Sequence, residues 1–329
     1  MTTKAASEVT KRLYGNEHKY VEEVLATEFR SSKGSGMCKR LEEEFAKKFG
    51  SKFAISFVNG TATMHAALEA HGVEPGDEVI VPPLTMSSTT FAVLQADATP
   101  VFADIDENTF QISPSSIAER ITPRTKAIIT VALYGLSPDM DPIMALAKKH
   151  DLLVIEDNAE CFLGKYKGRM VGTIGHCASF SFQSSKHITS GEGGMITTDS
   201  LELAERIRKV QSLGYAGVSA TKGKITKKDI QDPTYSRHVT MGWNYRMPEL
   251  CAAVALAQFE NLDALVGRRV EVAEMFQQAA AGHNWLYPQH VGPEYENSYW
   301  TWVARLDRKD ITWHQFRDKF QELGGHGVY

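Results

Sequence analysis

The sequence has few cysteines and no long hydrophobic run. The four cysteines (Cys38, Cys161, Cys177 and Cys251) lie far apart and form no Cys-x-x-Cys pattern, which argues against a structural zinc site or a redox dithiol. No apolar stretch approaches the roughly 18 residues of a membrane-spanning helix, and the first residues contain no apolar core of a secretory signal. We therefore expect a cytoplasmic protein with reduced thiols and no membrane partner.

Charge of one sign is not in excess either. The 329 residues include 36 Lys and Arg against 40 Asp and Glu, and the formal net charge is -4. This balance provides no general attraction to nucleic acid or anionic lipid. The eleven histidines show no spacing typical of metal ligands, so no metal site is expected.

Short apolar strands alternate with amphipathic helices along most of the chain. Strands joined by helices tend to run parallel and to be covered on both faces, so the alternation predicts an α/β fold with a largely parallel sheet. The expected strands are residues 53–58, 78–81, 100–105, 126–133, 152–156, 178–182 and 194–198. The expected helices are residues 38–49, 61–71, 115–120, 141–150, 201–213, 248–265 and 268–281.

Two domains of unequal size are expected. We place the boundary within residues 262–267, which gives a large domain of residues 1–264 and a small C-terminal α+β domain of residues 265–329. A further helix is expected from Phe316 to the glycines Gly324 and Gly325. About 65 residues is short for a domain, so we expect the C-terminal domain to be incomplete.

Lys186 follows the expected strand at residues 178–182 and precedes a glycine-rich stretch. A buried ammonium group is costly unless it is paired, but a desolvated lysine loses its proton readily and forms a Schiff base with a carbonyl. Asp157 ends another apolar strand. A Schiff-base lysine together with a carboxylate that faces a pyridine nitrogen is the protein side of a pyridoxal phosphate (PLP) site.

A phosphate site is indicated where the strand at residues 53–58 turns into a helix at Gly60 and Thr61. A helix N-terminus presents free N–H groups at its positive dipole end, which suits a phosphate. Most strand-to-helix turns look similar, so the turn alone is weak evidence. However, Asp157, Ser181 and Lys186 follow later strands of the same pattern, and the carboxyl ends of strands in an open α/β sheet converge on one crevice.

Residues 222–233 are rich in charge, glycine and proline and have no clear periodicity. Two interpretations remain open: a solvated surface loop, or a basic loop that meets the phosphates of an anionic substrate.

In the order and spacing of its motifs, the chain resembles the DegT-type (DegT/StrS) family of PLP-dependent sugar aminotransferases, which have fold type I. The resemblance runs from about residue 15 to the end of the chain and implies the fold type I large domain with a central, mostly parallel seven-stranded sheet. The matching motifs are Asn59-Gly60-Thr61-Ala62, Gly76-Asp77-Glu78, Thr122-Pro123-Arg124, Glu156-Asp157-Asn158-Ala159, Ser179-Phe180-Ser181-Phe182 with Lys186, Gly191-Glu192-Gly193-Gly194 and Gly242-Trp243-Asn244-Tyr245-Arg246.

The resemblance implies a catalytic role for Lys186. This lysine should hold PLP and then move the proton between the substrate carbon and the cofactor. Asp157 should keep the pyridine nitrogen protonated, because a carboxylate beside a cation favours its charged form. Ala159 should lie flat beneath the ring.

The resemblance also implies which residues bind the phosphate of PLP. Ser181 should donate to it together with Gly60, Thr61 and Ala62. Asn244 should reach the phosphate that is bound in the neighbouring subunit, which implies a homodimer with shared active sites.

Two residues depart from the family pattern. Met86 stands where many members carry an aromatic residue that stacks on the PLP ring; a methionine can pack there through its polarizable sulfur. Glu160 stands where many members carry a glutamine that contacts the PLP hydroxyl oxygen. A glutamate must be protonated to make that contact, or tolerate a phenolate, or point elsewhere. We expect both residues to belong to the cofactor site.

The implied activity is transfer of an amino group, with L-glutamate as the expected donor, to a 4-keto or 3-keto deoxysugar linked to a nucleotide. One alternative is a dehydratase of the same family, in which a histidine replaces the Schiff-base lysine; a register slip of one residue would put His187 there. A second alternative is a non-catalytic sensor that has kept the fold.

Overall fold

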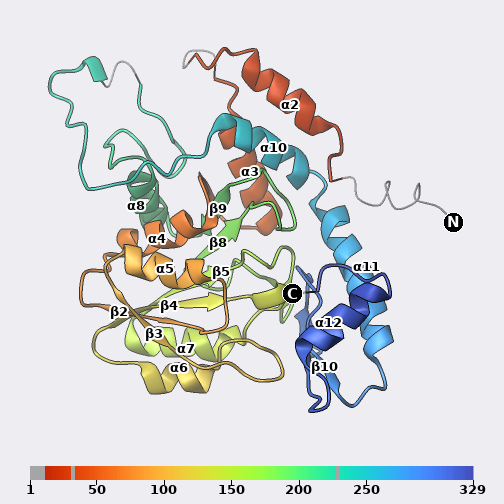
Figure 1. The fold of residues 1–329 in the computed structure, drawn as a ribbon. Coiled ribbons are helices and arrows are strands. Elements are labelled where there is room, and N and C mark those ends of the chain that lie inside the picture. The colour runs from red at the N-terminus through yellow and green to blue at the C-terminus, as the bar shows by residue number, and fades with distance from the viewer. Residues whose placement is uncertain (1–11, 31–33, 227–229, 329) are drawn as a thin grey trace.

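The computed structural model describes residues 12–30, 34–226 and 230–328. Its centre is a seven-stranded sheet with the strand order β1-β9-β8-β5-β4-β2-β3 (Figure 1). From β8 to β3 all neighbouring strands are parallel, whereas β9 is antiparallel to both β1 and β8. The predicted α/β fold with a mostly parallel seven-stranded sheet is confirmed. The strands are β1 (Phe53–Phe57), β2 (Glu78–Val81), β3 (Thr99–Phe102), β4 (Thr125–Val131), β5 (Leu153–Asp157), β8 (Cys177–Ser181) and β9 (Gly194–Thr198).

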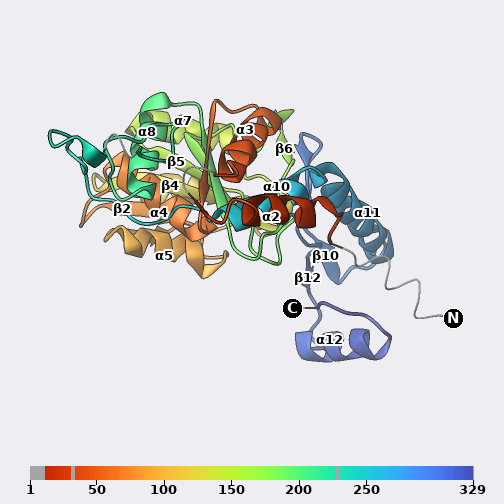
Figure 2. The same ribbon diagram turned by 90° about the horizontal axis from the view of Figure 1, so that it is seen from above.

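Helices cover both faces of the sheet, because alternate residues of its apolar strands are buried on opposite sides. On one face, Ile129 and Ile155 share a core with α4, α5 and α8. On the other, Ile128 and Val154 pack with α6 and α7, and Phe180 packs with α3 and α10. Figure 2 shows α4 and α5 on the opposite side of the sheet from α3 and α7. These helices are α3 (Met37–Phe49), α4 (Gly60–His71), α5 (Ser87–Gln95), α6 (Pro114–Arg120), α7 (Met140–His150), α8 (Leu201–Gln211) and α10 (Glu249–Phe259).

A group of phenylalanines joins α3, β8 and α10. The ring centroid of Phe45 lies 4.5 Å from Phe49, 5.0 Å from Phe180 and 4.9 Å from Phe259. Stacked and edge-on rings at this spacing add to the free energy gained by burying their area. These phenylalanines hold α3 and α10 against β8, the strand that precedes Lys186.

The C-terminal part contains α11 (Leu262–Ala280), the antiparallel strands β10 (Leu286–Pro288) and β12 (Ala304–Leu306), and α12 (Trp313–Glu322). No residue of α12 is buried, and Figure 2 shows this helix set apart from the sheet. A second small sheet pairs β11 (Tyr295–Glu296) with β6 (Lys165–Tyr166), which in turn pairs with β7 (Arg169–Met170). The C-terminal part is therefore attached to the large domain by strand pairing, and α11 runs across the boundary that we expected at residues 264 and 265.

The expected single helix at residues 248–265 is wrong. The chain breaks after α10, and α11 leaves at an angle of 60°. The Asn261 side chain donates to the carbonyl oxygen of Ala257 at 3.1 Å, and such local side-chain bonds compete with helix continuation. No single described helix is long and apolar enough to cross a membrane; α10 and α11 meet that length and composition only as a bent pair, and α10 is mostly buried in the protein.

Two helices were not expected from the sequence. α5 reads Ser-Ser-Thr-Thr-Phe-Ala-Val-Leu-Gln, which is poor in strong helix formers. α2 (Asn16–Leu25) packs on α10, and the Tyr20 hydroxyl donates to Glu260 at 2.5 Å.

The expected C-terminal helix is present as α12. It begins at Trp313, three residues earlier than expected, because Thr312 and Gln315 form a capping box.

Candidate active site

The strand ends converge as the parallel pattern predicted. Asp157 is the last residue of β5 and lies between Val131 of β4 and Ser179 of β8. Gly194, the first residue of β9, pairs with both Phe57 at the end of β1 and Ser181 at the end of β8. One edge of the sheet thus holds Asp157, Ser181 and the turn into α4.

Lys186 is buried and faces Glu160. Lys186 is 9 % exposed, and its Nζ lies 3.3 Å from Glu160 Oε1. The other Glu160 oxygen accepts a hydrogen bond from the Tyr134 N–H at 3.1 Å. The ring of Trp300 lies 4.6 Å from Nζ, a distance typical of a cation–π contact. The structure therefore pairs the buried ammonium, as its burial requires, and it brings Glu160 into the site with Lys186.

Asp157 is 3 % exposed and has two hydrogen-bond donors. The Thr89 hydroxyl donates to one oxygen at 2.9 Å, and the Ala159 N–H donates to the other at 3.2 Å. Burial raises the pKa of Asp157, while these two donors and the positive charge of Lys186 oppose the rise. A buried carboxyl group with raised pKa is suited to a cationic partner, which would restore its charged form.

The turn from β1 into α4 lies against Ser181. A Cβ atom added to Gly60 would come within 3.0 Å of the Ser181 Cβ. The Asn59 side chain caps α4 by accepting the Ala62 N–H at 2.8 Å. Ala62, one of the predicted phosphate donors, therefore already uses its N–H in this conformation, whereas the first N–H groups of the helix, those of Gly60 and Thr61, have no partner within the helix.

The Ser181 hydroxyl accepts a hydrogen bond from the Gln183 N–H at 3.3 Å. Its own hydrogen has no acceptor among the residues that the structure describes, so the hydroxyl can donate it to a ligand. A helix N-terminus, a serine hydroxyl, a buried lysine and a buried aspartate at one sheet edge fit the phosphate, aldehyde and ring nitrogen of PLP. The residues present thus suit this cofactor.

Three predicted residues lie closer to the surface. Met86 is 68 % exposed at the N-cap of α5, so no packing role is visible for it here. Ala159 is partly exposed beside Asp157. Asn244 is exposed on a loop whose backbone pairs with Ser212, and its side chain makes no hydrogen bond to any residue that the structure describes.

His187 contacts Ser298 and Phe162. Its Nε2 lies 3.0 Å from the Ser298 carbonyl oxygen, and its ring lies 5.5 Å from that of Phe162. Because a carbonyl oxygen only accepts, Nε2 carries the hydrogen; Nδ1 is buried without a partner among the described residues. Burial lowers the pKa of His187 to about 3, so the ring is neutral at physiological pH.

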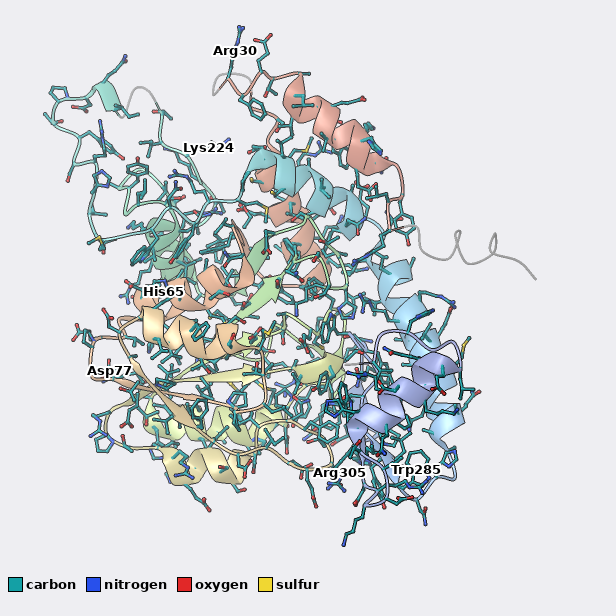
Figure 3. All side chains as sticks on the ribbon, in the orientation of Figure 1. Arg30, His65, Asp77, Lys224, Trp285 and Arg305 are labelled. Carbon is teal, nitrogen blue, oxygen red and sulfur yellow. The ribbon has the colours of Figure 1, made fainter. Side chains whose placement is uncertain are left out.

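The loop at residues 222–233 gives mixed results. Lys224 (Figure 3) is paired with Glu249 at 3.2 Å, and Lys227 and Lys228 lie outside the described residues.

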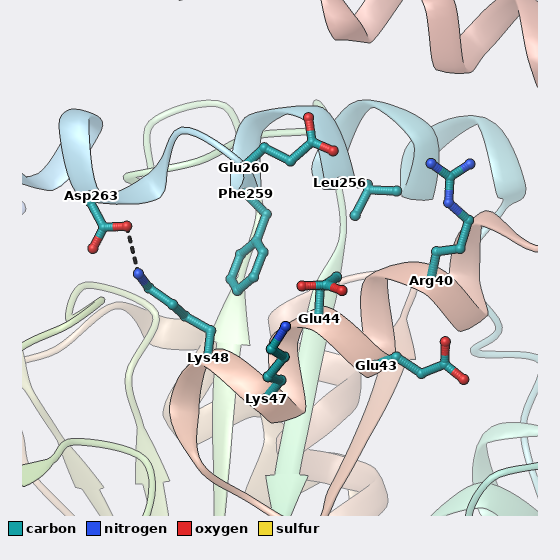
Figure 4. Close-up of a pocket in the computed structure, with 9 residues that line it drawn as sticks. All are labelled: Arg40, Glu43, Glu44, Lys47, Lys48, Leu256, Phe259, Glu260 and Asp263. Atoms are coloured by element: carbon teal, nitrogen blue, oxygen red, sulfur yellow. Dashed lines mark hydrogen bonds and ion pairs between the residues drawn. The ribbon is translucent and has the colours of Figure 1, made fainter.

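A hollow of about 610 Å³ lies between α3 and the junction of α10 with α11 (Figure 4). Its lining has charges of both signs, including the Lys48–Asp263 pair, and contains none of the predicted site residues.

Several residues of this site were not found from the sequence, namely Arg12, Thr89, Tyr134, Arg269 and Trp300. Each reaches the site from a distant segment, and no local motif marks it.

Comparison with known proteins identifies the family. The DegT/DnrJ/EryC1/StrS aminotransferase family matches residues 12–325. The GDP-perosamine synthase of Caulobacter vibrioides is 41 % identical over 297 residues, which are 90 % of this chain and 76 % of that protein. The aminotransferase structure from Psychrobacter cryohalolentis is 32 % identical with a TM-score of 0.86, over 95 % of this chain and 81 % of that one.

A more distant structure is that of a GDP-4-keto-6-deoxymannose-3-dehydratase with a trapped PLP–glutamate geminal diamine. It is 27 % identical with a TM-score of 0.84, over 95 % of this chain and 82 % of that one. The expected family, fold type and cofactor are therefore confirmed: the chain belongs to the DegT/DnrJ/EryC1/StrS aminotransferase family, whose cofactor is PLP.

Proposed function

We propose that the protein transfers an amino group from L-glutamate to the keto carbon of a deoxysugar that is linked to a nucleoside diphosphate. The names of its relatives support a nucleotide-linked sugar, and the glutamate adduct trapped in the dehydratase structure supports the amino donor. A GDP-linked 4-keto-6-deoxysugar is the first substrate to test.

The observation that carries the proposal is the buried group formed by Lys186, Glu160 and Asp157. Bound PLP supplies an electron sink that makes a proton on the amine-bearing carbon removable. Lys186 provides the amine that binds the cofactor and afterwards accepts and returns that proton at Nζ. Asp157 stabilises the positive ring nitrogen, and the buried surroundings strengthen this interaction by excluding water.

The phosphate is assigned to the start of α4 and to Ser181. Gly60 and Thr61 offer backbone N–H groups and Ser181 offers a hydroxyl, all at one place on the sheet edge. Ala62 contributes through the positive end of the helix, because its own N–H is taken by Asn59.

Lysine rather than histidine occupies the catalytic position in this proposal. The contact of Lys186 with Glu160 favours amination, since His187 packs against Phe162 and Ser298 instead. The two reactions give different products: amination leaves nitrogen on the sugar, whereas dehydration removes one of its hydroxyl groups.

The test uses the purified protein with PLP. A visible absorption band, its fixation on Lys186 by borohydride and its loss in Lys186→Ala are expected, with the exposed Lys52→Ala as control. Glutamate should then bleach the band, and the ketosugar should restore it with nitrogen in the sugar product. A protein that takes up no PLP, or one that releases a deoxygenated sugar without nitrogen, contradicts the proposal.

We also propose a homodimer in which Asn244 reaches the phosphate bound by the partner. Its loop exposes Val239, Met241 and Trp243, which a second copy would cover. Mixing inactive Lys186→Ala with Asn244→Ala should restore activity, because one of the two sites then has both native residues. No restoration after verified subunit exchange would place Asn244 and Lys186 in the same chain's site, whereas an Asn244→Ala protein that is fully active by itself would place Asn244 in neither site.

A further inference from the structure

In the turn that carries Lys186, backbone carbonyl oxygens accept hydrogen bonds from residues near both ends of the chain. Ser184 and Ser185 are exposed at the surface, whereas Lys186 is buried. The turn closes with a hydrogen bond from the Lys186 N–H to the Gln183 carbonyl at 3.0 Å. Short turns of this kind do not by themselves fix the direction of a long side chain, so external contacts decide how firmly it is held.

Arg12 holds this turn from the N-terminal side. Its guanidinium group donates to the carbonyl oxygens of Ser184 at 2.5 Å and Lys186 at 2.8 Å. Its own carbonyl accepts from the side chain of Gln258 in α10. The first described residue of the chain is thus bonded both to the large domain and to the backbone of Lys186.

Arg269 and Trp300 hold the same turn from the C-terminal part. Arg269, on α11, donates to the carbonyl oxygens of Ser185 at 3.3 Å and Lys186 at 3.2 Å, and also to the carbonyl of Trp300. The Trp300 indole N–H donates to the Ser185 carbonyl at 2.9 Å, and its ring lies 4.6 Å from the Lys186 Nζ. A single tryptophan therefore contacts both the backbone of the turn and the amine itself.

We infer that Arg269 and Trp300 are positioning residues that let the C-terminal part hold the Lys186 amine in its working direction. The inference rests on the proposed role of Lys186 as the residue that binds PLP. Hydrogen bonds from a charged group are stronger than those from a neutral donor. Two such bonds, one from Arg12 and one from Arg269, meet at the carbonyl oxygen of Lys186. Among the described residues, Arg269 and Trp300 make their hydrogen bonds to the lysine turn and to each other, not to Asp157, Ser181 or the start of α4, so their action passes through the lysine turn.

The electrostatic surroundings agree with this geometry. Burial, and then the nearby charge of Arg12, lowers the pKa of Arg269 to about 10. The guanidinium group is therefore still charged at neutral pH, and the three carbonyl oxygens satisfy the donors that burial would otherwise leave costly.

The sequence provides a matched control for each residue. Arg268 precedes Arg269 on the same helix but is exposed and paired with Glu271 at 2.9 Å. Trp302 lies two residues after Trp300, and its indole N–H donates to Gln277 at 3.0 Å. Substituting these neighbours removes the same chemistry without touching the lysine turn.

The experiment measures PLP affinity from the visible band of the full-length protein, and the pH at which that band changes. Arg269→Gln should weaken PLP binding by roughly tenfold, the effect of about one charged hydrogen bond, and should shift the pH at which the band changes. Trp300→Phe, which keeps a ring but loses the donor, should have a smaller effect of the same kind. Arg268→Gln and Trp302→Phe should match the native protein.

Rescue separates positioning from general stability. Guanidinium ion at a concentration below that which unfolds the protein should restore PLP affinity to Arg269→Ala but leave Arg268→Ala unchanged. If Arg269→Gln lowers only the thermal unfolding temperature, with native affinity and a native pH profile, the inference is overturned. If native protein itself takes up no PLP, the proposed function has failed instead.

Discussion

Glu156 and Asp157 are neighbours on β5, yet they face opposite sides of the sheet and have different surroundings. Glu156 accepts hydrogen bonds from the N–H groups of Gly172, Ile174 and Gly175 at 2.6–2.7 Å. Among the described residues, the donors to Asp157 are the Thr89 hydroxyl and the more distant Ala159 N–H. Burial raises the pKa of both carboxyl groups.

The difference separates a structural acid from a functional one. Three backbone donors compensate Glu156 within the fold, and they tie the loop after β7 to the sheet. Asp157 has fewer donors and lies near a lysine, so it retains capacity for a cation from outside the chain. Strongly perturbed groups that lack a complete set of internal partners are candidates for function.

The largest effect should come from a change of Lys186, which lies beside the functional acid Asp157. Lys186→Ala should reduce transamination by roughly 10³-fold or more, since it removes both the attachment of PLP and the proton carrier. Because the backbone hydrogen bonds from Arg12, Arg269 and Trp300 to the turn do not depend on the lysine side chain, the fold should remain intact by circular dichroism. Turnover with glutamate and ketosugar measures the effect, and activity near native would contradict the assignment.

Next comes the acid sensitivity contributed by His187. Its pKa is lowered to about 3 in the folded protein, so the unfolded state binds a proton first as the pH falls below about 6.5. The contribution of His187 to the free energy of unfolding should therefore be complete above that pH. It should fall by about 2 kcal/mol by about pH 5. His187→Gln, which can still donate to Ser298, should flatten this part of the pH profile in urea unfolding.

A loss of similar size is expected when the structural acid is changed. Glu156→Gln turns one side-chain oxygen into an N–H₂ group, which costs least where it faces the single donor of Gly172 and leaves an oxygen for Ile174 and Gly175. One buried donor loses its acceptor, which costs about 2 kcal/mol in the free energy of unfolding. PLP uptake by the folded fraction should stay native; a selective loss of PLP uptake would erase the distinction from Asp157.

The smallest effect on stability should have the opposite sign. With its pKa raised in the folded protein, Asp157 contributes stability at low pH that is lost as the pH rises through its ordinary value and above. Asp157→Asn should therefore stabilise the PLP-free protein slightly at neutral pH, while weakening PLP binding. The stability gain should vanish at low pH, where the native carboxyl group is protonated in both states.

The seven central strands were predictable because each is a short apolar run, and the observed ends differ from the predicted ones by at most three residues. Helices were predicted less evenly. The break at Asn261 depends on one side-chain bond to Ala257, and α5 is stabilised by tertiary packing rather than by its own residues.

The residues of the candidate site also differ in how far the sequence could predict them. Lys186, Asp157 and Ser181 could be predicted because each follows a recognisable strand, and parallel strands end at one edge. Thr89, Arg269 and Trp300 could not, because they come from segments between 68 and 115 residues away from their partners. Only the folded chain reveals such contacts.

Gly194 has a consequence for anyone who wishes to redesign this enzyme. A methyl group there would come within 2.6 Å of the Asn59 backbone carbon and 2.9 Å of the Gly60 nitrogen. Any side chain at this position would wedge β9 away from the start of α4, so Gly194 acts as a fixed spacer rather than a flexible hinge. Variants that aim to alter cofactor affinity should leave this spacer untouched and vary the rim instead.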